Sequence, residues 1–392
     1  MQFIERFILS YGPAALVLVG VVVLFFIIQL IQYARLAALV GYRNSDRRQG
    51  RESYPSVSVI IPLFNEDYGF VEERLPLFLQ QNYKNDKGAD VPFEVVVVYV
   101  GLSSDFHEDL LRIREHYHHL IISRIHFDPR RPISRKMALN IGIKSAQYEC
   151  MVFSSTDAIP TSENWLNVVA RGFERGNVVL SYCGLEELPG MMNTLMRTGR
   201  MMHSAEWLSR AASGKPYRGT LHNFGFTKKL YFHPRVKGFN QLGMNIGEDD
   251  LFVERIASRK NTSLVLTPRA TIRQKVWGGL SWWISERRYY GSAAPFYPSG
   301  VRWRKFWEPT ARLIFHLSTL LVILLLPLEF KIGAAALWLL RLGWVLFEVK
   351  RIARRLGEKR VLGCYPIYDL FSPYWTFVLW CIMLRKDERV WR

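Results

Sequence analysis

The sequence has few cysteines, and those it has show no paired spacing. There are four in 392 residues, at Cys150, Cys183, Cys364 and Cys381. That spacing predicts neither a disulfide framework nor a zinc site. It is typical of a catalytic region that works in a reducing compartment.

Acidic residues are also scarce relative to basic ones. The chain has 34 Asp and Glu against 52 Lys and Arg, a formal net charge of +18. Such a balance suits nucleic acid, an anionic membrane or an anionic substrate. The chain lacks an arginine-rich low-complexity tail, a zinc-finger motif and any internal repeat. Much of the surplus charge lies beside apolar runs, where anionic lipid explains it, so no nucleic-acid partner is expected.

Long apolar runs are present, and the first lies near the N-terminus. Residues 14–28 carry no polar side chain, and with their flanks they are long enough to cross a bilayer as a helix. A signal peptide is the competing interpretation, but Arg6 stands beside Glu5 at the start and no convincing cleavage site follows. Several arginines follow the run, and basic residues collect on the cytoplasmic side. We therefore expect a transmembrane anchor at 1–34, with the N-terminus outside.

The region 35–275 is predicted to be a cytoplasmic α/β domain. Its apolar runs are continuous, as in strands covered on both faces, and they alternate with helical spacing, which predicts a mixed, mostly parallel sheet. Ligands on such sheets bind beyond the carboxyl ends of the strands, where Asn65, Gly101 and Asp157 fall. The expected strands are 57–64, 93–100, 119–127 and 148–155, and the expected helices are 70–82 and 135–146.

Aromatic and basic residues mix in the region 276–311, which suits the bilayer interface and predicts an amphipathic interfacial segment. Transmembrane or re-entrant helices are expected over 312–392, from apolar runs at 313–328, 332–349 and 367–384. The first two runs would form a hairpin, with the basic loop 350–360 on the cytoplasmic side.

Two charged residues complicate these runs. Arg341 lies in the middle of the second run, where a charge is costly in lipid, so it is expected to face protein or the interface. The third run contains Asp369 as well as Pro373. A span and a re-entrant or surface helix are both compatible with it.

Five motifs, in this order and spacing, resemble the membrane-bound family-2 glycosyltransferases, which have the GT-A nucleotide-diphospho-sugar transferase fold. The resemblance covers about 55–300 with the flanking membrane helices, and it extends to short membrane-anchored transferases in bacteria of the Bacteroides type. It implies a multi-pass protein of a bacterial inner (cytoplasmic) membrane, with a cytoplasmic GT-A domain between transmembrane and interfacial helices. The motifs are "SVIIPLFNE" (58–66), "SRKMALNIGIKSA" (134–146), "FSSTDAIP" (153–160), "GEDDLFVERI" (247–256) and "SERRYY" (285–290).

The resemblance implies a site for a UDP- or GDP-linked sugar. The turn with Pro62, Asn65 and Glu66 would border the nucleotide, and an ordinary strand-to-helix turn with a cap is the alternative. Lys136 would contact the donor phosphates through charge-assisted hydrogen bonds. The alternative for Lys136 is a solvated basic helix start.

The chain departs from the family where the second strand ends. An acid that pairs with the base is expected there, but Tyr99 and Val100 occupy those positions. Base contacts would then come from backbone groups, from Ser103 or from Asp105, and the identity of the base stays open.

A second departure concerns the metal. The family places two acids around a small residue, and here Ser155 takes the first position and Asp157 the second. Mg²⁺ or Mn²⁺ usually needs only one or two protein carboxylates beside substrate phosphates. Asp157 is therefore expected to bind the divalent metal, with Ser155 assisting at the donor. A turn or cap role for Asp157 is the alternative.

Three adjacent acids, Glu248, Asp249 and Asp250, are candidates for the general base that takes a proton from an acceptor hydroxyl. Alignment with the family implies Asp249, and Asp250 is the alternative because the triple acid leaves the register open by one residue. The alternative is that these acids mark a helix N-terminus, where the helix dipole favours negative charge.

The element around "SERRYY" would lie beneath the donor. Arg287 or Arg288 would neutralise the pyrophosphate charge, and Trp282 and Trp283 would line the acceptor site. The alternative is an amphipathic interface helix with snorkelling arginines.

Together these expectations describe an inverting, hexosyltransferase-type enzyme that moves a sugar from a nucleotide donor to a hydroxyl of a lipid-linked acceptor. The alternative is a non-catalytic, degenerate transferase-like membrane protein that binds nucleotide, lipid or a partner. The missing acids at Tyr99 and Ser155 motivate that alternative.

Overall fold

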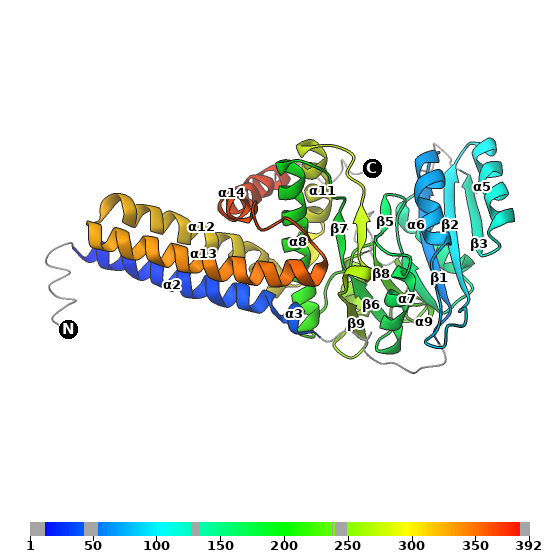
Figure 1. Ribbon diagram of the computed structural model, residues 1–392, viewed down its shortest axis with the longest axis horizontal. Helices are drawn as coiled ribbons and strands as arrows, with labels where there is room; N and C mark the ends of the chain where they lie inside the picture. Colours follow the sequence, from blue (N-terminus) through cyan, green and yellow to red (C-terminus); the bar gives the residue numbers. More distant parts are fainter. Residues whose placement is uncertain (1–11, 43–53, 127–132, 237, 240–248, 385–392) are drawn as a thin grey trace.

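The computed structural model describes residues 12–42, 54–126, 133–236, 238–239 and 249–384. Three long helices run side by side away from a domain built on a β-sheet, and α8, α11 and α14 lie where the two parts meet (Figure 1). The molecule is therefore elongated, with the sheet at one end.

A seven-stranded sheet forms the core of the domain, in the order β3-β2-β1-β4-β8-β6-β9. The first four strands are mutually parallel, whereas β8 runs antiparallel to both of its neighbours. The predicted mixed, mostly parallel sheet is confirmed. Its strands are β1 (Val57–Phe64), β2 (Phe93–Gly101), β3 (Leu120–His126), β4 (Cys150–Phe153), β6 (Val178–Ser181), β8 (Phe224–Thr227) and β9 (Thr262–Val265).

A smaller sheet of three short strands stands beside the first one. Its central strand, β10 (Ile272–Gln274), pairs antiparallel with β5 (Ala158–Pro160) and parallel with β7 (Cys183–Leu185). The pairing sets Gln274 opposite Ala158, directly after Asp157. The small sheet thus brings Gln274, from a distant part of the sequence, beside the turn that follows β4.

Helices cover the sheet, and one of them approaches it closely. α6 (Arg135–Ser145) packs on β1 and β2, and a Cβ at Gly142 would lie 2.6 Å from Ile60 Cγ2. The helix expected at 70–82 ends earlier, at Leu79, and its first five residues form a π-helical turn that leads into α4 (Leu75–Leu79). The others are η2 (Phe70–Arg74), α5 (Ser104–His116), α7 (Trp165–Ala170), η3 (Arg171–Glu174), α8 (Met191–Ala212), α9 (Lys228–Tyr231), α10 (Leu251–Ile256) and η5 (Pro268–Ala270).

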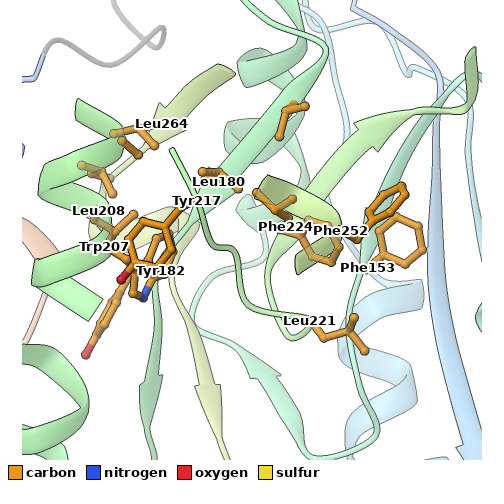
Figure 2. Packing of buried hydrophobic residues seen from close by; sticks show 14 of the residues in the cluster. Phe153, Leu180, Tyr182, Trp207, Leu208, Tyr217, Leu221, Phe224, Phe252 and Leu264 are labelled. Atoms are coloured by element: carbon orange, nitrogen blue, oxygen red, sulfur yellow. The ribbon is translucent and has the colours of Figure 1, made fainter. Parts of the chain in front are cut away.

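Aromatic side chains fill the core on the α8 side of the sheet. Figure 2 shows Phe153, Phe224 and Phe252 together, and the rings of Phe153 and Phe224 stack with centroids 5.1 Å apart. Trp207 and Tyr217 pack in the same buried cluster. This continuous packing gives the loop between α8 and β8 a rigid base.

Three helices in the described part of the chain are long and apolar enough to cross a membrane. They are α2 (Pro13–Leu36), which α3 (Ala38–Gly41) extends, α12 (Ser299–Leu325) and α13 (Leu328–Leu356). α12 is continuous from Ser299, so the boundary expected at 311 falls inside a helix. The interfacial segment before it contains α11 (Leu280–Ser292) and η6 (Ala294–Phe296).

The third apolar run forms α14 (Tyr365–Leu384), which is not among these three helices. It packs against α8, α11 and α12 near the sheet end of the bundle (Figure 1). The turn between α12 and α13 lies at the opposite end, beside the start of α2. The basic segment 350–360, predicted as a loop, is helical up to Leu356 as the end of α13. It lies with the sheet domain at one end of the bundle, as the predicted hairpin requires.

Arg341 faces protein, as predicted. Its side chain is fully buried and forms an ion pair with Asp369 of α14. Its Nη2 also donates to Gln29 Oε1 of α2 at 2.9 Å, and the Tyr33 hydroxyl donates to Asp369 at 3.2 Å. One buried polar cluster thus joins α2, α13 and α14.

We expect Asp369→Asn to lower the free energy of unfolding by about 3–5 kcal/mol, because it leaves the buried Arg341 without its counter-ion, and Arg341→Met to lower it by less, because Asp369 keeps Arg312 at 3.6 Å. Replacing both residues together should recover most of that loss. Thermal unfolding in detergent measures both effects, with the exposed Arg354→Met as the matched control. Equal losses in single and double variants would contradict the pairing.

A second buried cluster ties the end of α13 to the sheet domain. Glu358 accepts from the Tyr182 hydroxyl and from Arg197 Nη2, both at 2.8 Å. Arg273 of β10 also pairs with it. The bundle is therefore fixed to the strand that ends beside Asp157.

Candidate active site

A cleft of about 320 Å³ lies at the carboxyl ends of β1 and β4. This is the edge of the sheet where the sequence predicts ligand binding. Its wall mixes apolar, cationic and acidic groups from several elements. The lining residues are Pro62, Phe64, Arg135, Ser155, Thr156, Asp157, His222, Gln274, Trp277, Glu286 and Tyr289.

The turn after β4, which carries Asp157, is clamped by hydrogen bonds. Ser154 N donates to Ile60 O at 3.0 Å, and its hydroxyl donates to His222 O at 3.1 Å. The buried Arg74 donates from Nε to Thr156 O at 2.6 Å. These bonds come from three separate segments, so the position of the Asp157 carboxylate is set by the whole domain.

The Asp157 side chain points into a ring of donors. Ser155 Oγ donates to its Oδ1, His222 Nε2 lies 3.2 Å from the same oxygen, and Gln274 Nε2 donates to Oδ2 at 2.9 Å. Burial by itself would raise the pKa of Asp157. His222 and the hydrogen bonds outweigh burial, so the pKa lies well below its usual value. Asp157 is therefore an anion at neutral pH.

The chemistry of this group fits a hard divalent cation. A carboxylate has about four lone-pair sites, and three are used by Ser155, His222 and Gln274. The side chain keeps 22% of its surface exposed. In the described ranges no cluster of three or more His, Cys, Asp or Glu side chains forms a protein-only metal site. A site completed by substrate phosphates and water suits Mg²⁺ or Mn²⁺.

A hydrogen-bonded pair that the sequence does not suggest joins the end of β2 to the turn after β1. The buried Tyr99 hydroxyl donates to Glu66 Oε1 at 2.9 Å, and Ser103 N lies 3.4 Å from the same oxygen. Asn65, in the left-handed region at φ 61°, makes the turn that brings Glu66 there. The Tyr99 hydrogen bond lowers the pKa of Glu66. Burial and Glu66 raise the pKa of Tyr99 to about 12.

The family that the sequence resembles has an acid at the end of the second strand. Here Tyr99 occupies that position in β2, and the carboxylate at this edge belongs to Glu66, in the turn after β1. Asp105 is exposed in the first turn of α5, which Ser103 caps through Phe106 N at 3.1 Å. Glu66 is thus better held than Asp105.

The start of α6 presents a different cation from the one predicted. Lys136 is 8% exposed and does not line the cleft, whereas Arg135 does. Ser134 caps the helix through Met137 N at 3.3 Å. The cap sets the helix start beside the cleft, with Arg135 as its first residue.

Asp249 and Asp250 are both buried, and their surroundings differ. Asp250 Oδ1 accepts from Leu251 N at 2.7 Å and caps α10, while its Oδ2 accepts from the Tyr297 hydroxyl at 2.5 Å. These acids also act on Arg218. Burial alone would lower the pKa of Arg218, but interactions with Tyr297, Asp250 and Asp249 outweigh burial and raise that pKa. Asp250 therefore has structural contacts on both oxygens. Glu248 lies outside the described residues.

One short segment joins Asp249 to the Asp157 turn. Gly219 N donates to Asp249 O at 2.6 Å, and three residues later His222 contacts Asp157. Since consecutive Cα atoms are about 3.8 Å apart, the Cα atoms of Gly219 and His222 are at most about 11 Å apart. A Cβ at Gly219 would lie 3.2 Å from Asp249 O, so the approach suits glycine. Neither of the two cavities described here is lined by Asp249 or Asp250.

α11 separates the cleft from a second cavity. Tyr289 lines the cleft, Trp283 and Arg287, one turn apart, line the second cavity, and Glu286 lines both. Helical spacing places Tyr289 on the side away from Arg287, with Glu286 between them. Trp282 packs beside Trp283, and Arg288 lines neither cavity. Arg287, expected at the donor, thus lies on the other side of the helix.

Sequence reasoning missed several of these residues. His222 is a lone histidine in a loop, and Gln274 ends a three-residue strand. Arg218 and Tyr297 belong to no motif. For these four the sequence carries no signal beyond residue type, because their roles depend on contacts between distant segments.

The sequence matches no family model and no curated protein. Its structure is similar to the mannosyltransferase PcManGT from Pyrobaculum calidifontis, solved in complex with GDP-Man and Mn²⁺, with a TM-score of 0.55 and 18% identity over 91% of this chain and 99% of that chain. The chain therefore has a glycosyltransferase fold, and at this identity the likeness shows the fold alone. S. aureus TarS 1-349 has a TM-score of 0.40 and 17% identity over 81% of this chain and 89% of that chain, which carries no argument.

Proposed function

We propose that the protein is an inverting glycosyltransferase that moves a hexose from a UDP- or GDP-linked donor to a hydroxyl of a lipid-linked acceptor. The observation that carries the proposal is the cleft at the ends of β1 and β4, with an ionised Asp157 held by Ser155, His222 and Gln274. Its position matches the ligand edge of α/β sheets.

The donor diphosphate would occupy this cleft. Arg135 and the Asp157 turn supply one cation and one metal-binding carboxylate. Asp157 would hold Mg²⁺ or Mn²⁺, which when bound stabilises charge on the departing diphosphate. Glu66, fixed by Tyr99, would accept hydrogen bonds from the base at the strand end.

Asp249 would be the general base. The acceptor hydroxyl loses its proton to Asp249 while its oxygen bonds to the anomeric carbon from the side opposite the donor phosphate. The bond from the anomeric carbon to the phosphate oxygen breaks, and the nucleoside diphosphate leaves. Attack from the opposite side inverts the anomeric configuration. Both oxygens of Asp250 have structural contacts, with Tyr297 and the start of α10, and alignment with the family that the sequence resembles favours Asp249 for this role.

The chain would work at a cytoplasmic membrane face. The three long apolar helices support a membrane location. The basic segment 350–360, which contains the end of α13, lies at the sheet end of the bundle, and cations collect on the cytoplasmic side. Under this proposal the site stands at the inner face of a bacterial inner membrane, within reach of lipid-linked acceptors.

The test is release of nucleoside diphosphate by the purified full chain with a panel of UDP- and GDP-sugars and membrane lipid extract, with and without Mn²⁺. GDP-Man and Mn²⁺ come first, because the similar mannosyltransferase was solved with them. We expect Mn²⁺-dependent release that needs lipid and yields an inverted linkage. Nucleotide binding without release, across all donors and lipids, would instead identify a binding protein that has lost catalysis.

A further inference from the structure

The second cavity, of about 200 Å³, lies where the membrane helices meet the sheet domain. α8, α11, α12 and α14 supply most of its wall, and Leu36 of α2 completes it. Figure 1 shows these elements meeting at the sheet end of the bundle. The cavity thus lies at the level where the apolar helices give way to the polar domain.

The wall combines apolar surface with buried cations. Met202, Trp283 and Leu379 are among its apolar residues. Its cations are Arg200, Arg287, Lys305 and Arg312, and its acids are Glu206, Glu286 and Glu308.

Two of the cations lack an acidic partner. Arg200 pairs with Glu286 at 2.9 Å and Arg312 lies 3.6 Å from Asp369. Within the described part of the chain neither Arg287 nor Lys305 forms an ion pair, and each lies against an aromatic ring instead. Arg287 Cζ is 5.5 Å from the Trp283 ring centroid, and Lys305 Nζ is 4.8 Å from that of Tyr297.

The remaining acids do not offset these charges fully. Glu308 pairs with Arg304. Glu206 faces the cavity and accepts from the Tyr217 hydroxyl at 2.5 Å. His203 also lines the wall. Burial first, then Arg218 and Lys305, hold the pKa of His203 well below its usual value, so it is neutral.

The cavity is connected to the donor cleft by shared groups. Glu286 lines both. Arg200 Nη2 donates to Gln274 Oε1 at 2.8 Å, and Gln274 in turn donates to Asp157. Two side chains, Arg200 and Gln274, would therefore lie between an occupant of the cavity and the proposed metal ligand.

We propose that this cavity binds the phosphate group of a lipid-linked acceptor, with Arg287 and Lys305 as its anion ligands. The inference rests on the proposed function, because it names the acceptor's chemistry as a lipid phosphate rather than a neutral lipid. Apolar walls beside two cations suit a headgroup phosphate with the start of its chain. The neighbouring Tyr297 also binds Asp250, the residue next to the proposed base Asp249.

The experiment measures binding of undecaprenyl phosphate to the full-length protein in detergent, without any sugar donor. Lys305→Met and Arg287→Gln are each expected to weaken binding about ten- to a hundredfold, the usual effect of losing a hydrogen bond to a charged group. Lys350→Met and Arg302→Gln, at exposed cations, are the matched controls and should leave binding unchanged. Lys305→Arg keeps the charge and should retain most of the affinity. Thermal unfolding of each variant confirms that it is folded.

Three results would overturn the inference. The first is equal binding of the neutral alcohol undecaprenol. The second is displacement of the lipid by inorganic phosphate at matched concentration, which would identify a site for a free anion. The third is loss of UDP or GDP binding, but not lipid binding, in Lys305→Met, which would assign the cavity to the donor. A protein that binds the lipid phosphate through these cations but transfers no sugar would refute the proposed function alone.

Discussion

Asp249→Asn is expected to slow sugar transfer about 10²–10⁴-fold, the usual contribution of a positioned general base. Asparagine keeps the size of the side chain but cannot take the proton from the acceptor hydroxyl. Affinity for the nucleotide should not change, because the donor is held at the Asp157 cleft. Turnover at saturating donor, together with nucleotide binding by calorimetry, separates these two quantities.

The control is Glu254→Gln, one turn further along α10, which should transfer sugar at the normal rate. Asp250→Asn is the informative comparison, because asparagine also caps helices well and the fold should survive. If Asp250→Asn abolished transfer while Asp249→Asn retained it, the base would be Asp250.

Asp157→Asn is expected to lower the rate about 100-fold or more, since a divalent cation contributes several kcal/mol to stabilising a departing phosphate. The residual activity should no longer depend on Mn²⁺. Initial rates measured across a Mn²⁺ titration test this, with the exposed Glu163→Gln as the control. A normal Mn²⁺ response in Asp157→Asn would remove Asp157 from the metal site.

Ser155→Asp tests the same site in the opposite direction. It restores the paired acids of the resembling family, and divalent-cation affinity rises with the number of carboxylates. The Mn²⁺ concentration for half-maximal rate should fall about tenfold. An unchanged or higher requirement would show that the serine is not positioned to join the metal shell.

Much of the fold follows from local patterns. The runs at 57–64 and 93–100 are continuous and apolar, and only strands covered on both faces explain them. Arg341 is expected to face protein or the interface because charge in lipid is costly, and the structure shows that it faces protein. Asp157 could be placed at a strand end by the same reasoning about parallel sheets.

The partners of Asp157 could not be predicted in this way. His222 and Gln274 reach it from segments far along the chain, and the strand that carries Gln274 is only three residues long. A strand so short has no measurable periodicity. The pairing of Tyr99 with Glu66 is similar, because it depends on the left-handed turn at Asn65.

The two sides of α11 illustrate the same limit. The sequence predicts an amphipathic helix, and helical spacing separates Arg287 from Tyr289, while Glu286 lies between them and lines both cavities. Which side faces which cavity depends on how α8, α12 and α14 pack around it. That arrangement is tertiary, so Arg287 was expected at the donor and lies in the other cavity.

The buried contact between Arg341 and Asp369 has a consequence for biogenesis. With the bundle in a membrane, as proposed, α13 would be inserted before α14 is synthesised, because it precedes α14 in the chain. Until then Arg341 could contact Gln29 Oε1 and the rings of Tyr33 and Phe315 from earlier helices, but not its counter-ion. Asp369 would thus be the last partner to arrive, and α14 would complete the burial of a charge carried by the helix before it.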